Sequence, residues 1–180
     1  WRFDWAALFA GHLSFFLFLN APDLALQARL AGNRSRLLIE DMTGHLPVSL
    51  AAHWLPLPPG SVAGRINISM QRIVLINARP SAADGIIALT SLSLSWPQSA
   101  ALGDYELKLQ TQGDGIHGRL LDTSGPLMVQ GSLRVTPDGG YDLTGVVAAR
   151  DSANAALNNL LQYLPSNQDG KHTFDINGKW

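Results

Sequence analysis

The residues that most often bind metals are few in this sequence and lie far apart. No two histidines have the i, i+4 spacing that would place both on one face of a helix. Cysteine is absent, which excludes disulfides, a thiol nucleophile and thiolate-bound zinc. A metal site assembled from distant positions is the alternative, but each histidine is better explained as a strand or surface residue. We therefore predict no metal site; the histidines considered are His12, His45, His53, His117 and His172.

The carboxylates are explained better by turns than by catalysis. An aspartate at a turn accepts hydrogen bonds from nearby backbone amides and needs no reactive partner. General acid–base chemistry or glycoside hydrolysis would need two converging carboxyl groups, and the spacing shows no such pair. No Gly-x-Ser-x-Gly nucleophile elbow occurs either. We therefore predict no catalytic residues; the aspartates expected at turns are Asp23, Asp84, Asp114, Asp138 and Asp169.

Three segments match known motifs by letter only. Residues 113–118 fit the dinucleotide pattern G-x-G-x-x-G, but we expect them inside a hairpin, where no helix follows to hold a phosphate. Asn33-Arg34-Ser35 and Asn67-Ile68-Ser69 fit the N-glycosylation pattern, which matters only in a eukaryotic secretory context. We predict no cofactor.

The composition narrows the class of protein. The chain has 180 residues, enough for one domain with its own core. Thirteen basic residues against fourteen acidic ones give a net charge of -1, and nucleic-acid binding would favour a concentrated basic face. Only 15% of the residues are charged while 46% are hydrophobic. This balance indicates burial on two sides, or a surface that faces a partner or lipid.

Residues 102–150 show the clearest structural pattern. Apolar and polar residues alternate through several runs, which gives each run one apolar face and one wetter face. Asp114-Gly115, Ser124-Gly125-Pro126 and Asp138-Gly139-Gly140 separate the runs, as tight hairpin turns require. We predict an antiparallel meander of about four strands, which the rest of the chain extends. The alternating residues are Tyr105, Leu107, Leu109, Leu127, Val129, Leu133, Val135, Tyr141, Leu143 and Val147.

Further strand signals precede this region. Strands are expected at residues 1–5, 13–19, 24–30, 34–41, 62–77 and 86–96, with a turn at 79–85. Serines and threonines line one side of strand 88–96, which we expect to be a solvated face; the alternative is a free sheet edge that could accept a strand of another chain. Residues 6–19 fit a buried strand better than membrane contact, because a spanning helix needs ~20 residues. Residues 44–59 fit an apolar connection with helical turns at 48–54; a domain boundary is the alternative.

The C-terminal part contains the single clear helix signal. Asp151 or Ser152 can cap a helix at about 152–164, which carries alanines and leucines at i, i+3, i+4 spacing and ends before Pro165. His172, Phe174 and Ile176 alternate in a final strand. The predicted fold is therefore mainly β: a single domain, residues 1–180, built on a long, curved antiparallel meander sheet, with this helix followed by the final strand.

Several short segments occur in an order that is typical of one protein family. They are Leu46-Pro47, Gly64-Arg65-Ile66, Trp96, Leu102-Gly103-Asp104-Tyr105-Glu106-Leu107, Gly131-Ser132-Leu133, Tyr141-Asp142-Leu143-Thr144-Gly145, Ala148-Ala149-Arg150-Asp151-Ser152-Ala153, Asp169-Gly170-Lys171-His172 and Gly178. In this order they resemble the type II secretion system protein N family, also called general secretion pathway protein N. The segments are structural, and the resemblance brings no catalytic residues with it.

The resemblance implies a non-enzymatic component of the machine that exports folded proteins across the outer membrane of Gram-negative bacteria. It also implies a single-pass inner-membrane anchor before Trp1, with this domain in the periplasm. The implied partners are the secretin and the inner-membrane platform proteins. Two other readings remain: a lipid- or hydrophobe-binding envelope module that uses the apolar face of a curved sheet, and an enzyme. We expect the tryptophans to be mainly core residues, and any exposed one to be a contact anchor; they are Trp1, Trp5, Trp54, Trp96 and Trp180.

Overall fold

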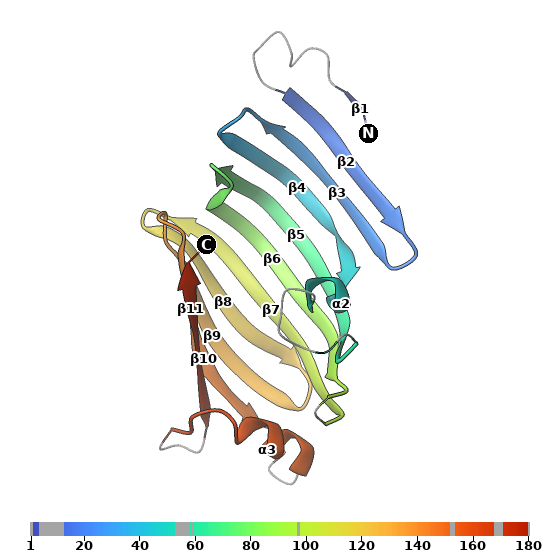
Figure 1. Ribbon diagram of the computed structural model, residues 1–180, viewed down its shortest axis with the longest axis vertical. Coiled ribbons are helices and arrows are strands. Elements are labelled where there is room, and N and C mark those ends of the chain that lie inside the picture. Colours follow the sequence, from blue (N-terminus) through green and yellow to red (C-terminus); the bar gives the residue numbers. More distant parts are fainter. Residues whose placement is uncertain are drawn as a thin grey trace.

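One antiparallel sheet makes up most of the molecule. The computed structural model describes residues 2–3, 13–52, 58, 60–96, 98–151, 154–167 and 171–179. Within these ranges eleven strands pair strictly in sequence order, and Figure 1 shows the sheet curving from β1 to β11. The predicted mainly-β meander is confirmed. The strands are β1 (Arg2–Phe3), β2 (Leu13–Ala21), β3 (Leu24–Gly32), β4 (Arg36–Pro47), β5 (Val62–Ile76), β6 (Arg79–Leu94), β7 (Ala100–Gln112), β8 (Gly115–Ser124), β9 (Leu127–Val135), β10 (Gly140–Ala149) and β11 (His172–Lys179).

Tight turns lie at two of the predicted Asp-Gly positions. Gly113 and Asp114 form the turn between β7 and β8, and residues 137–138 form the turn between β9 and β10. Gly115 and Gly139 have φ angles of +140° and +91°, which a residue with a Cβ rarely adopts. Residues 113–118 therefore form a hairpin, as expected, and not the start of a helix.

The turn expected at residues 79–85 was wrong, because the reversal lies at Asn77 and Ala78. Both residues have positive φ angles, of 50° and 63°. Strand β6 then continues through Gly85, opposite a bulge where the β5 partner changes from Met70 to Arg72. A Cβ on Gly85 would lie 2.5 Å from the Met70 Cα atom. Glycine is needed here because two backbones approach closely, and not because the chain turns.

The structure excludes the alternative of a free edge at strand 88–96. Strand β6 is internal, with β5 on one side and β7 on the other. A bulge near Leu92, with a φ angle of 54° at Ser91, interrupts the expected alternation. Within the described ranges, the sheet ends at β11 on one side. On the other side it ends at β1, which pairs only with Phe15 and Phe16 of β2.

Strand β4 extends to Pro47, past the predicted end at residue 41. The chain bulges here: Asp41 has a φ angle of 50°, and the paired register of β3 shifts between Gln27 and Arg29. The bulge breaks the alternation in the sequence, although strand pairing resumes after it. Helix α2 (Val48–Ala52) falls inside the helical turns expected at 48–54. Residues 53–57 and 59 lie outside the described residues.

The C-terminal helix, α3, spans Ala155–Leu161 and is shorter than the predicted 152–164. Its N-cap is Asn154, whose side-chain oxygen accepts a hydrogen bond from the Leu157 amide at 3.2 Å. The expected cap at Asp151 or Ser152 was wrong, because the asparagine three residues on supplies the same acceptor; Ser152 itself lies outside the described residues. Leu157 and Leu161 form the buried stripe, as predicted.

Two groups of buried side chains form the core. The helix cluster joins α3 to strands β7, β9 and β10 and contains Ala100, Tyr105, Leu127, Val129, Val147, Leu157 and Leu161. The strand cluster contains Met70, Ala83, Leu109, Ile116 and Val135. Residues from strands that are not neighbours meet in these clusters because the sheet curves around them.

A pair of facing glycines lets β11 close over the helix cluster. Gly131 and Gly145 are partners across β9 and β10. A Cβ would lie 3.2 Å from the Phe174 ring at Gly131 and 2.5 Å from it at Gly145. The ring therefore fills the space that two side chains would take. Both glycines belong to the segments that resemble the secretion family.

Candidate functional site: an apolar sheet face and the turns at its end

Cross-strand partners share one face of a sheet, so the register traces rows of side chains across it. One such row contains only apolar residues and glycine from β2 to β11. A second row beside it, from β4 to β11, has the same character: Met42, Met70, Gly85, Leu109, Gly118, Leu133, Leu143 and Ile176. The first row is Leu19, Leu26, Gly44, Ile68, Ile87, Leu107, Leu120, Gly131, Gly145 and Phe174.

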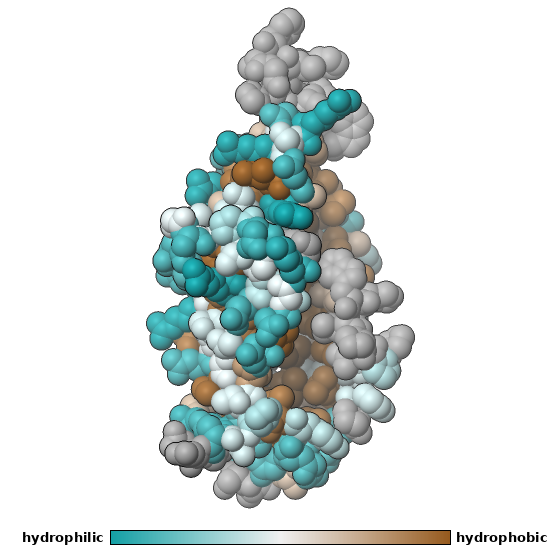
Figure 2. Space-filling model, turned by 60° about the vertical axis from the view of Figure 1, so that its left-hand side comes forward, coloured by the Kyte–Doolittle hydropathy of each residue, from teal (hydrophilic) through white to brown (hydrophobic). Residues whose placement is uncertain are grey.

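The opposite face carries a mainly polar row. Figure 2 shows hydrophilic residues over most of the outer surface, while hydrophobic residues gather along the hollowed side. We call the apolar side the inner face and the polar side the outer face. The outer row is Phe18, Gln27, Thr43, Ser69, Ile86, Lys108, Arg119, Ser132, Thr144 and Asp175.

The inner face is covered unevenly. In its C-terminal half it packs on itself and on α3, so that Met70 and Leu109 are only 3% and 8% exposed. Among the described residues, neither core cluster includes a side chain of β2 or β3. Leu19 on β2 is 45% exposed, whereas Ala28 on β3 is only 5% exposed. A hollow of about 520 Å³ borders Leu19, Leu26 and Gly44 of the inner row and also Phe18, Gln27 and Thr43 of the outer row. Among the described residues, the inner face is thus open at Leu19, near the end of β2.

An aromatic patch lies on the outer face of the same strand. Phe16 and Phe18 are 37% and 59% exposed, and their rings stack with centroids 6.4 Å apart. The Arg29 guanidinium lies 5.3 Å from the centre of the Phe16 ring, as in a cation–π contact. Arg29 also lies 3.9 Å from the carboxylate of Asp41. Strand β2 is therefore apolar on both faces, which is unusual beside a sheet edge.

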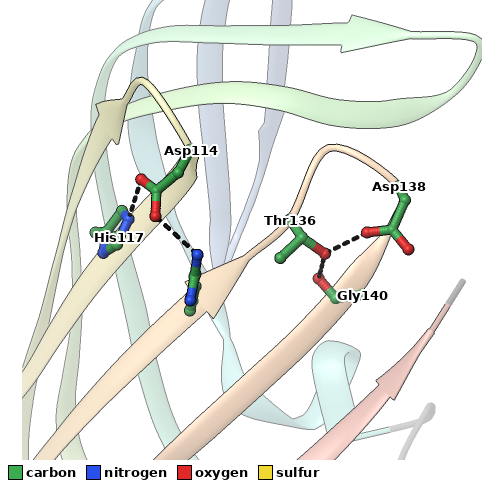
Figure 3. Close-up of polar contacts among 6 residues, drawn as sticks. Asp114, His117, Thr136, Asp138 and Gly140 are labelled. Carbon is green, nitrogen blue, oxygen red and sulfur yellow. Dashed lines mark hydrogen bonds and ion pairs between the residues drawn. The ribbon is translucent and has the colours of Figure 1, made fainter.

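At the turns of β7–β10 the charged groups pair with one another (Figure 3). The Asp114 carboxylate contacts His117 at 2.7 Å and Arg134 at 2.8 Å. The hydrogen bond with His117, helped by the charge of Arg134, holds the pKa of Asp114 below its usual value. Asp114 lies in the turn that precedes β8, and its contact with Arg134 links this turn to β9. We therefore interpret these ion pairs as structural.

The next turn is closed in the same way. The Lys179 ammonium donates to Asp138 at 2.8 Å, and the Thr136 hydroxyl donates to the other carboxylate oxygen at 2.6 Å. The bonds with Lys179 and Thr136 hold the pKa of Asp138 well below its usual range. Asp138 is therefore an anion at neutral pH, and its carboxylate bonds to the turn through Thr136 and to β11 through Lys179.

Three arginines at the same end of the sheet contrast with these pairs. Arg34 lies in the turn between β3 and β4, Arg36 begins β4, and Arg79 begins β6 after the next turn. The two turns adjoin, because the Asn77 amide donates to the Ser35 carbonyl at 2.7 Å. All three side chains are exposed, and among the described residues none of the three has an ion-pair partner. We call this group the arginine end.

Comparison with protein-family models identifies the family. The model described as "Type II secretion system (T2SS), protein N" matches residues 1–177. The chain belongs to this family. The predicted resemblance is confirmed, and the type II secretion system is thereby the machinery in which this chain takes part. A search of curated proteins and a search of solved structures each gave no significant match.

The residues on which the secretion-family resemblance was based mainly stabilise the fold. Tyr105 is 6% exposed, and its hydroxyl donates to the Leu102 carbonyl at 2.6 Å. Burial, and then the negative charges of Asp122 and Asp104, raise the pKa of Tyr105 to about 12. Trp96 is 54% exposed, so the expectation of a core residue was wrong at this position. Trp1, Trp5, Trp54 and Trp180 lie outside the described residues.

The residues considered for chemistry are dispersed. His45 lies on β4, His117 pairs with Asp114, and the His172 Nδ1 atom lies 3.0 Å from the Leu164 carbonyl. Asp84 accepts from the Thr111 amide at 2.7 Å and from Arg72. Asp23 is in the β2–β3 turn, and the structure does not describe His12, His53 or Asp169.

The described residues contain neither a cluster of metal ligands nor a membrane-spanning helix. In the part of the chain that the structure covers, no three histidines, aspartates or glutamates come together as metal ligands would. Likewise, none of the described helices has the length and hydropathy needed to cross a membrane.

Sequence reasoning missed the aromatic patch and the arginine end. For the patch a signal was present: apolar residues at successive positions 15–19 cannot all face one side of a strand.

Proposed function

We propose that this chain is a non-enzymatic periplasmic component of the type II secretion system. In this proposal residues 1–180 act as one domain, held at the inner membrane of a Gram-negative cell by a single-pass anchor that precedes Trp1. The domain takes part in export across the outer membrane through contacts with the secretin and the inner-membrane platform proteins. The family match over residues 1–177 is the observation that carries the proposal.

The polar groups of the described residues support a binding role over a catalytic one. Asp84, Asp114 and Asp138 each have hydrogen-bond partners that hold strands or turns together. A general acid or base needs a pKa near the working pH, whereas the pKa of each of these aspartates is lowered. For Asp84, burial alone would raise the pKa, but the hydrogen bonds from Thr111 and Arg72 lower the pKa by more.

The aromatic patch is the contact surface that we propose for a machine component. Exposed phenylalanines beside an arginine resemble the aromatic and arginine anchors that dominate protein interfaces. A hollow of about 190 Å³ beside Phe16, Phe18 and Arg29 could accept a side chain of the partner. The patch lies on the outer face of β2, so a partner can reach it without disturbing either core cluster.

Binding measurements with purified periplasmic domains test this proposal. We expect the chain to bind a domain of the secretin or of a platform protein, and the double change F16S/F18S to weaken that binding about tenfold or more. The matched control is L19S, which changes the neighbouring residue on the inner face of the same strand. It should leave the affinity unchanged.

Two results would count against the proposal. The first is that wild-type protein binds none of these domains by interferometry at micromolar concentrations. The second is that F16S/F18S and L19S weaken binding equally, which would place the contact elsewhere.

A further inference from the structure

Strand β11 is the last strand of the sheet, and only one of its two edges pairs with another strand. It pairs with β10 without a bulge from His172 to Lys179, and Figure 1 shows it at the end of the sheet. Among the described residues, no strand of the sheet lies along its other edge. Proteins usually protect such an edge with a bulge, a proline or a covering loop, because free amides and carbonyls can bind a further strand.

A loop covers only the beginning of this edge. The Thr173 amide donates to the Pro165 carbonyl at 2.8 Å, so the backbone groups of Thr173 point away from β10. Backbone groups of successive strand residues alternate in direction. Those of Asp175, Asn177 and Lys179 therefore also point away from β10. Among the described residues, no loop bonds to the backbone of these three, and they are free to pair with a further strand.

The positions of these groups select one way of pairing with a second copy of the chain. In an antiparallel pair, two opposite residues whose backbone groups face each other exchange two hydrogen bonds. A two-fold axis at Asn177 places Asn177 opposite itself and Asp175 opposite Lys179, which uses all three free residues of each copy. An axis at Asp175 or Ile176 would place Thr173 opposite the second copy, although the Thr173 amide already has a partner in the loop.

The charges on the outer face complement one another in this register. Asp175 and Lys179 are both exposed, and each would lie opposite the other residue of the second copy. Opposite charges at facing positions stabilise a strand pair, whereas like charges weaken it. Among the described residues Asp175 has no ion pair, and the Lys179 ammonium has three protons, one of which it donates to Asp138.

On the inner face the same register covers an exposed isoleucine. Ile176 is 53% exposed and lies in the second apolar row. It would lie opposite Gly178 of the second copy. A Cβ on Gly178 would lie 2.5 Å from the Tyr141 hydroxyl oxygen, so the Tyr141 side chain occupies the space beside this glycine. Ile176 would therefore gain an aromatic neighbour instead of facing water.

We propose that two copies of this chain form a dimer in which β11 of one copy pairs antiparallel with β11 of the other, around a two-fold axis at Asn177. Such an interface uses the same surface of both copies, so assembly stops at two. Pairing through so short a segment is a small interface, and we expect a dissociation constant on the order of micromolar. This inference rests on the pairing of β11 and not on the proposed function.

Cysteine cross-linking tests the register, since the chain has no native cysteine. We expect Asn177→Cys to form a covalent dimer on mild oxidation, because the two Cα atoms at the axis would lie about 5.5 Å apart, within the range of a disulfide. Asp142→Cys is the matched control, because Asp142 is exposed on the same face and is the β10 partner of Asn177. Its two copies would lie roughly 14 Å apart and should not cross-link. Asp175→Cys should not cross-link with itself either, because Asp175 faces Lys179.

Sedimentation equilibrium measures the association without a cross-link. Asn177→Pro removes the amide at the axis and should raise the dissociation constant of the dimer at least about tenfold. The variant should fold, because this amide points away from β10 and proline is tolerated on an edge strand. Asn177→Ser is the matched control: it changes the side chain, keeps the amide and should leave the dissociation constant within about twofold of the wild-type value.

Three outcomes would overturn the proposal. Asn177→Cys and Asp142→Cys could cross-link equally, as random collisions would produce. A wild-type dimer could survive Asn177→Pro, which would place the contact elsewhere. Wild-type protein could stay monomeric at every concentration; if Asn177→Pro then weakened binding to a secretin domain, a strand of another protein would be the partner of β11. Failure of the dimer leaves the proposed function intact, because F16S/F18S on β2 tests that function at the other end of the sheet.

Discussion

Replacing Leu157 by alanine is expected to lower the free energy of unfolding by about 2 to 5 kcal/mol. Leu157 is 1% exposed and is the most deeply buried large side chain among the described residues. It joins α3 to Tyr105, Val129 and Val147 of the sheet. Truncation would remove apolar contacts and leave a cavity that the strands cannot close, because their register is fixed by pairing on both sides. Urea denaturation followed by tryptophan fluorescence measures the change.

The control for this variant is Asn159→Ala on the exposed side of the same helix. It should change stability by no more than about 0.5 kcal/mol. If Leu157→Ala also cost less than about 1 kcal/mol, the helix would not be packed on the sheet as described.

Stability is expected to fall as the pH rises from 10 to 12, because the unfolded chain then releases the Tyr105 proton while the folded protein keeps it. Its pKa is raised from 10.0 to about 12, first by burial and then by the charges of Asp122 and Asp104. A raised pKa stabilises the folded protein below the unfolded-state pKa, and this stabilisation is lost as the pH passes through the folded-state value. The difference corresponds to roughly 2 to 3 kcal/mol.

The Tyr105→Phe variant isolates this effect from the titration of lysines and other tyrosines. It should lose less stability than wild type over the same pH range, although it starts lower because the bond to the Leu102 carbonyl is gone. Denaturation curves at several pH values give the comparison. Equal losses in the two proteins would show that Tyr105 is not buried in the protonated form.

Alternation and turn residues were enough to predict a β meander, because each strand pairs with its neighbour in the sequence. The Leu stripe of α3 was equally clear, since Leu157 and Leu161 need a surface to cover. The errors came from residues that serve two purposes. Asp84-Gly85 is a typical turn sequence, but Gly85 lies within a strand, where the backbone of Met70 is too close to leave room for a Cβ atom. Only the paired register reveals such an approach.

The candidate site was harder to predict for the same reason. The two-sided apolar character of residues 15–19 is visible in the sequence, but which side is open depends on the curvature of the sheet and on where α3 packs. The arginine end brings Arg36 of β4 and Arg79 of β6 together on either side of Ile76 of β5, although they are far apart in the sequence. Whether an arginine has an acidic partner is decided by that register, and no local pattern records it.

A single-cysteine scan of β2 tests most directly the claim that the inner face is apolar and open at Leu19. The chain has no native cysteine, so Phe16, Leu17, Phe18 and Leu19 can each be replaced by cysteine and labelled with the polarity-sensitive dye acrylodan. The label at 17 should emit at shorter wavelength than the labels at 16, 18 and 19, because Leu17 is half-buried and the other three side chains are exposed. A label at 19 that emits at shorter wavelength than the label at 17, as in a covered core, would contradict the account.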